Sequence, residues 1–156
     1  MDANTSAEKS QVLAAQESLI EDFEFFDDWM DRYGFLIDLG KDLPAFPAEH
    51  LNDGWKIQGC QSQVWLYPEM RDGLLHFEGK SDASIVSGLI AILLQVYSDK
   101  APADILANKP DFIAKIGFSD HLSPTRSNGL HAMLKAIYTY ADFAVKGLPL
   151  TENLVD

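Results

Sequence analysis

The sequence contains one cysteine, Cys60, among its 156 residues. A single thiol cannot close an internal disulfide, and it leaves too few sulfur ligands for a zinc cluster or an iron–sulfur centre. The H-E-x-x-H motif, a glycine-rich phosphate loop and a dinucleotide-binding fingerprint are absent too. These absences argue against a metal site and against a nucleotide-dependent enzyme. Sparse cysteine usage also predicts a reducing, cytoplasmic environment.

Long apolar runs and basic side chains are also scarce. The longest apolar run, residues 85–96, is interrupted by polar residues and is too short to cross a bilayer. Residues 1–11 show neither the basic start nor the apolar core of a targeting peptide. Only 12 basic residues accompany 24 acidic ones, and the net charge of −12 repels phosphate backbones and anionic lipids. We therefore expect a soluble protein without nucleic-acid or membrane partners, whose acidic surface maintains solubility or attracts a basic partner.

Apolar periodicity predicts helices in the first part of the chain. Apolar side chains recur there at three- and four-residue steps, as on one face of one helix or of two. The Asp27-Asp28 pair can cap the second of these helices. The predicted face consists of Leu19, Ile20, Phe23, Phe26, Met30, Tyr33, Ile37 and Gly40.

A small sheet and further helices are predicted next. Short strands are expected at residues 55–58, 64–67 and 74–78, with a hairpin turn at Asp72-Gly73. Residues 83–97 are apolar around nearly the whole circumference, as in a central buried helix, and Ser81 or Asp82 is expected to cap it. Helical segments follow at 102–107, at 111–116, and after the Ser123-Pro124 cap.

This order of elements predicts the fold class and the domain organisation. Helices, then strands, then helices indicate an α+β domain in which a small three-stranded antiparallel sheet packs against several helices. We expect a single domain over residues 16–147. A flexible N-terminal tail is expected at residues 1–15, and a C-terminal tail at residues 148–156.

Cys60 falls in the connection between the first two predicted strands. A structural cysteine usually lies among apolar residues, whereas this one follows a glycine and precedes three uncharged hydrogen-bonding side chains. Such a setting favours a loop tip on a rigid frame, where the sulfur can meet another molecule. A packed or inert thiol is the alternative.

A reactive cysteine works as a thiolate, so something must favour its negative charge. Arg126 lies in the first turn of the last predicted helix, where the guanidinium and the helix N-terminus would both favour an anion. A surface ion pair is the alternative role of this arginine. A cysteine hydrolase would also need a histidine as base. No Cys-His signature matches the spacing of the four histidines, His50, His76, His121 and His131.

The stretch Ile57-Gln58-Gly59-Cys60-Gln61-Ser62-Gln63-Val64-Trp65 resembles the sulfur-acceptor signature of the SufE family, which includes CsdE. Three more blocks agree in matching order, at residues 39–44, 79–91 and 122–130. The similarity covers roughly residues 26–144. It implies a SufE-like fold, and a carrier protein that activates a PLP-dependent cysteine desulfurase of the SufS or CsdA kind.

By this resemblance, Cys60 accepts the outer sulfur of the desulfurase persulfide and passes it to an iron–sulfur scaffold or another acceptor by thiol exchange. The resemblance implies no cofactor in this chain, because PLP belongs to the partner. It implies a sulfur-transfer partner rather than an enzyme; a stand-alone cysteine-nucleophile enzyme and a cluster scaffold are the alternatives. The other residues implied to form the loop or to lie near the partner surface are Gly59, Gln61, Ser62, Gln63, Asp82 and Arg126.

Overall fold

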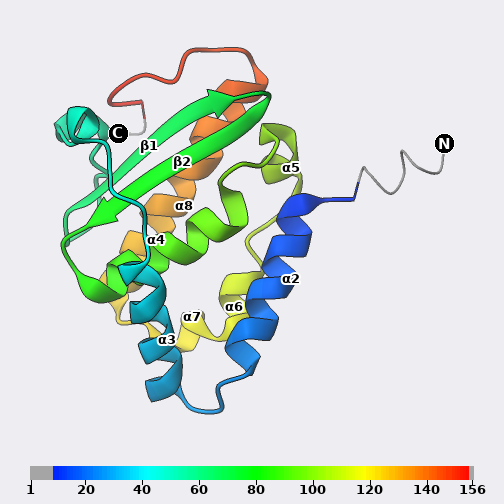
Figure 1. Cartoon of the computed structure of the whole chain (residues 1–156), viewed down its shortest axis with the longest axis vertical. Helices are drawn as coiled ribbons and strands as arrows, with labels where there is room; N and C mark the ends of the chain where they lie inside the picture. The colour runs from blue at the N-terminus through cyan, green and yellow to red at the C-terminus, as the bar shows by residue number, and fades with distance from the viewer. Residues whose placement is uncertain (1–8, 155–156) are drawn as a thin grey trace.

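A two-stranded antiparallel hairpin, β1 (Val64–Arg71) and β2 (Leu74–Ser81), lies across a layer of helices (Figure 1). The computed structural model describes residues 9–154. The α+β class is confirmed. Around the hairpin lie α2 (Gln11–Glu24), α3 (Trp29–Lys41), the 3-10 turns η1 (Ala48–His50) and η2 (Asp53–Trp55), α4 (Ser84–Tyr97), α5 (Pro102–Ala107), α6 (Phe112–Ile116), α7 (Phe118–His121) and α8 (Pro124–Val145).

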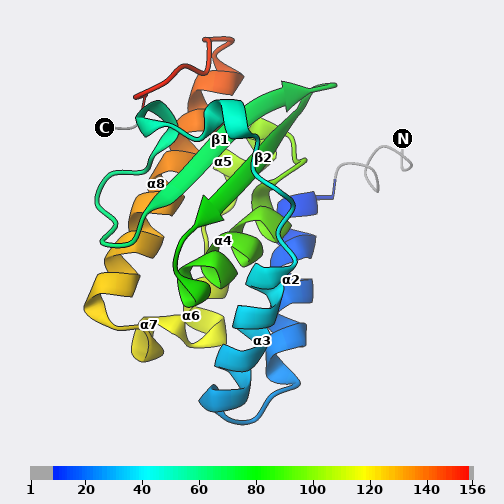
Figure 2. The ribbon, with the colours of Figure 1, turned by 60° about the vertical axis from the view of Figure 1, so that its left-hand side comes forward.

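The hairpin covers α4 and α8 (Figure 2). Its register runs from Val64 opposite Ser81 to Arg71 opposite Leu74, and the predicted Asp72-Gly73 turn closes it with positive φ at both residues. One residue in two along each strand is buried against the helices, as expected of a sheet with one solvated face.

The prediction of a third strand at residues 55–58 is wrong. Trp55 ends the 3-10 turn η2, which begins where the Asn52 side chain accepts a hydrogen bond from the Gly54 amide. Only Lys56 then pairs with β1, as an isolated bridge to Trp65. The left-handed turn at Gly59 follows at once, so the segment leaves the sheet after a single pairing.

The central helix α4 is confirmed as a buried element, with Leu89, Ile92 and Val96 fully inaccessible to solvent. Its predicted cap is wrong. The N-cap residue is Ala83, which makes no side-chain capping bond. Ser81 instead accepts a hydrogen bond from the Ala83 amide, and the Asp82 carboxylate is engaged by another loop.

The crossing of α3 over α4 depends on glycine. A Cβ on Gly88 would lie 2.3 Å from the Leu36 carbonyl oxygen, and one on Gly40 would lie 2.6 Å from the Gly88 amide nitrogen. Only glycine allows the two backbones to approach this closely.

Two helix caps are as predicted, whereas one apolar residue is not. Asp28 accepts from the Asp31 amide at 2.8 Å and caps α3, and Ser123 accepts from the Arg126 amide at the start of α8. Met30, predicted on the apolar face of α3, is 82% exposed. The stripe that faces the core passes through Leu36 instead, which turns Met30 outward.

Part of each segment that was predicted to be a tail is folded in the structure. Helix α2 starts at Gln11, so residues 11–15 are helical, and its N-cap Ser10 donates to Asp104. Residues 1–8 of the predicted tail lie outside the described residues. At the other end, Leu150 and Leu154 pack against the core, and the Asn153 amide donates to the Gly54 carbonyl at 2.9 Å. None of the described helices has the length and apolar character needed to cross a membrane.

Candidate functional site

Cys60 lies on the loop that leads into β1, above helices α4 and α8. The base of the loop is closed by a hydrogen bond of 2.8 Å from the Ile57 amide to the Val64 carbonyl. At its far side the Gln63 amide donates to the Asp82 carboxylate at 3.1 Å. Gly59 has a φ of +88°, a left-handed conformation that favours glycine, and this turn directs the next residue towards α8. The loop is therefore fixed at both ends and turns sharply before the thiol.

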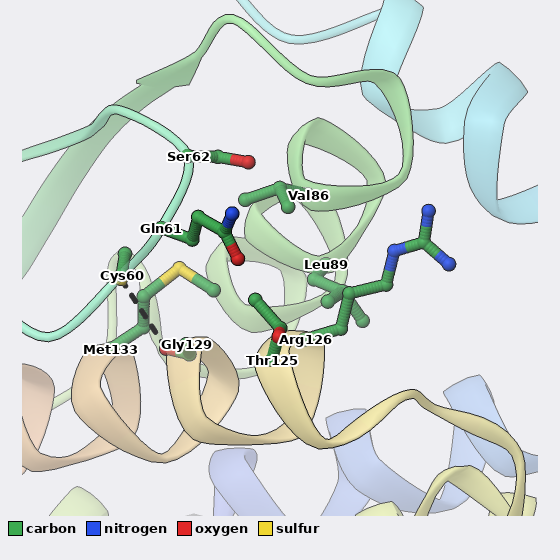
Figure 3. A pocket seen from close by; sticks show the side chains of 9 residues that line it. All are labelled: Cys60, Gln61, Ser62, Val86, Leu89, Thr125, Arg126, Gly129 and Met133. Carbon is green, nitrogen blue, oxygen red and sulfur yellow. Dashed lines mark hydrogen bonds between the residues drawn. The ribbon is translucent and has the colours of Figure 1, made fainter.

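The thiol points into a small pocket between the loop and the two helices (Figure 3). Its Sγ lies 3.8 Å from the Gly129 carbonyl oxygen, as a weak S–H donor. The apolar wall consists of Val86, Leu89 and Met133. The pocket volume is about 20 Å³, which is room for about one water-sized group beside the sulfur.

Burial raises the pKa of the Cys60 thiol above its ordinary value. Withdrawal from water disfavours the charged thiolate, and among residues 9–154 no compensating charge offsets this effect. Arg126 lines the same pocket, but its guanidinium points away from Cys60 (Figure 3). In this conformation Arg126 does not activate the thiol, and burial favours the neutral form of the sulfur.

A wider groove opens beside the pocket. It measures about 710 Å³ and is lined by Ile37 of α3, by the first turn of α4, and by the first turn of α8. Gln61, Ser62 and Arg126 border both the groove and the thiol pocket. The outer part of the loop thus separates the thiol from a space large enough for part of another molecule.

The predicted site residues lie together around this loop. Gln61, Ser62 and Arg126 join Cys60 at the pocket, whereas Gln63 and Asp82 are bonded to each other at the far side. Sequence reasoning missed Gly129, whose added Cβ would lie 3.6 Å from the Cys60 Sγ. A glycine in a helix interior costs about 1 kcal/mol relative to alanine. A glycine within a long predicted helix, despite this cost, was the available signal that another segment packs closely against the helix at Gly129.

No histidine lines the thiol pocket. The His50 ring stacks on Tyr67 with centroids 3.7 Å apart, and the His121 ring stacks on Trp29 at 4.2 Å. Within residues 9–154, no group of three or more His, Cys, Asp or Glu side chains is arranged to hold a metal ion. The geometry therefore supports a thiol without a neighbouring base.

Comparisons with known proteins identify a family for this chain. The model of the family described as "SufE: Fe-S metabolism associated domain" matches residues 17–141. An uncharacterized SufE-like protein of Rhizobium meliloti is 43% identical over 135 residues, which cover 83% of this chain and 96% of the relative. One from Rhizobium etli is 44% identical over 130 residues, which cover 80% and 88%. The solution structure of a hypothetical protein from Thermus thermophilus has a TM-score of 0.71 at 18% identity, covering 85% of this chain and 96% of that one, and supports the fold alone.

Proposed function

Because the chain belongs to the SufE family, which is associated with iron–sulfur metabolism, we propose that Cys60 accepts sulfur from a cysteine desulfurase and carries it as a persulfide towards iron–sulfur cluster assembly. The observation that carries the proposal is the position of the lone thiol. It lies in an apolar pocket that leaves space for about one further group beside Sγ, on a loop next to an open groove.

The transfer is a thiol exchange. The Cys60 thiolate attacks the outer sulfur of the persulfide on the desulfurase, a new S–S bond forms, and the S–S bond of the donor breaks. The partner cysteine leaves as a thiolate, and the transferred sulfur keeps its proton or releases it to water. Nothing is oxidised or reduced overall. The chain has no second cysteine that could discharge the persulfide as an internal disulfide.

The loop must open for this reaction. In the described conformation the Cys60 side chain is half-buried, and Sγ faces the Gly129 carbonyl and the apolar wall, where burial raises the thiol pKa. The sulfur is therefore turned away from a persulfide on another protein. Swinging outward about the fixed ends of the loop brings the sulfur to the groove, next to Arg126 and the N-terminus of α8. Both of these favour a thiolate there. Closing again returns the loaded sulfur to the pocket, away from other thiols in solution.

The same step explains stimulation of the desulfurase. Removal of the outer sulfur regenerates the free cysteine of the partner for its next turnover with L-cysteine. The PLP that cleaves L-cysteine belongs to the desulfurase. On this chain, Asp82 and Arg126 flank the loop on exposed positions and contribute to the surface that receives the partner.

The test is the intact mass of the chain during desulfurase turnover. Incubation with desulfurase and L-cysteine should add the mass of one sulfur atom to the wild-type chain and accelerate turnover, and Cys60→Ser should abolish both effects. The double variant Cys60→Ser/Ser119→Cys is the matched control, since it keeps one thiol but moves it to an exposed position on α7. An unmodified wild-type mass during active turnover contradicts the proposal. Equal loading of the relocated thiol contradicts the role of the pocket.

A further inference from the structure

The turn between α2 and α3 displays two large apolar side chains in water. Phe25 is 83% exposed and Met30 is 82% exposed, whereas the next most exposed large apolar side chain in residues 9–154 is Val145 at 51%. This α2–α3 corner, residues 21–31, forms the lower end of the molecule in both views (Figures 1 and 2). None of its residues lines the thiol pocket or the adjoining groove.

Hydrogen bonds and ring packing fix the backbone of this corner, so the positions of Phe25 and Met30 on the surface are defined. The Arg32 guanidinium donates to the carbonyl oxygens of Phe26 and Ile116, both at 2.9 Å, and so ties the turn to α6. The Phe26 ring packs on Phe35 with centroids 5.1 Å apart. Phe26 is thus used for folding, and the Phe25 ring meets it edge to face with centroids 5.4 Å apart. The rest of the Phe25 ring and the Met30 side chain remain exposed to another molecule.

The charged side chains of residues 10–31 are all acidic. No lysine, arginine or histidine occurs between Lys9 and Arg32. Arg32 itself bonds the two carbonyls and lies over the Trp29 ring. Across residues 9–154, no cationic side chain lies within 4.0 Å of the acidic side chains of this segment, which are Glu17, Glu21, Asp22, Glu24, Asp27, Asp28 and Asp31.

We propose that the α2–α3 corner binds a basic segment of a partner protein that also carries apolar side chains. Phe25 supplies a rigid aromatic anchor and Met30 an adaptable one, while the surrounding carboxylates attract lysine and arginine. A second copy of this chain fits poorly, because each copy carries a net charge of −12. An anionic membrane is repelled for the same reason. This proposal does not depend on the sulfur chemistry of Cys60.

The test uses the full-length ¹⁵N-labelled protein and a synthetic helical peptide of about 18 residues, or five turns, with leucine on one face and lysine on the other. At about 0.15 M salt, where surface charges are screened beyond about 8 Å, amide shifts should concentrate on residues 21–33. Phe25→Ser/Met30→Ser should weaken binding at least about tenfold. Leu106→Ser/Val145→Ser, which removes exposed apolar side chains elsewhere, should change it less than about twofold.

Four outcomes would overturn the proposal. The first is a set of shifts spread over acidic residues throughout the surface, and the second is equal binding of a matched leucine–glutamate peptide. The third is a concentration-dependent dimer that Phe25→Ser/Met30→Ser abolishes in sedimentation, because the surface would then bind a second copy. The fourth is binding to phosphatidylglycerol vesicles that the same variant abolishes. Both substituted side chains are exposed, so melting temperatures should match the wild type.

Discussion

Gly129→Ala tests whether the pocket holds the transferred sulfur. The added Cβ would lie 3.6 Å from the Cys60 Sγ and 4.0 Å from its Cβ, which is ordinary contact, so the unloaded thiol fits as before. Alanine also suits a helix interior better than glycine, by about 1 kcal/mol. The unloaded variant should therefore be more stable than the wild type in chemical denaturation.

The loaded protein should respond in the opposite direction. A second sulfur bonds about 2 Å from Sγ, and the space available to it is about 20 Å³. A new methyl group on the pocket wall takes up that space, and overpacking of this kind costs about 1–3 kcal/mol. The closed, loaded state should lose that much stability, and the exposed persulfide should become about 5- to 150-fold more populated.

The assay is the rate of sulfide release when dithiothreitol is added to the persulfidated protein. Gly34→Ala is the matched control, because Gly34 lies inside α3 and a Cβ there meets nothing within 4 Å. It should give a similar gain in stability without a change in sulfide release. If Gly129→Ala is stabilised and yet releases sulfide at the wild-type rate, the pocket does not shelter the persulfide and our reasoning is refuted.

Three further predictions concern the loop, the thiol and the hairpin. Asp82→Ala removes the acceptor of the Gln63 amide, a hydrogen bond of about 0.5–1.5 kcal/mol, so alkylation of the thiol by iodoacetamide should accelerate about 2- to 12-fold. Asp82→Asn keeps an acceptor oxygen and should largely restore the wild-type rate. An unchanged rate for Asp82→Ala would show that this bond does not hold the loop closed. Because burial raises the thiol pKa, the alkylation rate should rise with pH to a midpoint above that of free cysteine, and a midpoint below it would contradict the neutral pocket. Burial lowers the pKa of His76, but its hydrogen bonds to Glu78 and Asp99 outweigh this and the net pKa is raised. The stabilisation by this imidazolium is complete below about pH 6.5, the unfolded pKa, and is lost as the pH rises through the higher folded pKa. Denaturation midpoints should fall over that range in the wild type and not in His76→Gln, and an equal fall in both would exclude this histidine as the cause.

Local features of the fold were predictable from local chemistry. The Asp72-Gly73 turn and the caps at Asp28 and Ser123 follow from residue types whose side chains or backbone freedom act within a few positions. The wrong cap of α4 arose where a distant segment competes. Asp82 was a reasonable cap for α4, but in the folded chain its carboxylate accepts from the Gln63 amide instead.

The same distinction between local chemistry and tertiary packing applies to the candidate site. The loop around Cys60 was predicted from its own residues and from its resemblance to a sulfur-acceptor signature. The pocket wall was not, because Val86 and Met133 are brought beneath the loop by the packing of α4 and α8. The position of α4 is in turn fixed partly by close backbone contact between Gly88 and Leu36 of α3, which periodicity along one helix does not reveal. The raised pKa of the thiol depends on burial against this wall, so it could not be predicted from the loop residues alone.

The hydrogen bond from the Asn153 amide to the Gly54 carbonyl connects the last described residues to the segment that leads into the reactive loop. Gly54 belongs to the short turn that feeds directly into the strand bridge at the base of that loop. A change that breaks this bond should therefore disturb the base of the reactive loop as well as the remote segment that carries Asn153. Reactivity is best compared between preparations that share an identical carboxyl end, with purification handles fused at the opposite one.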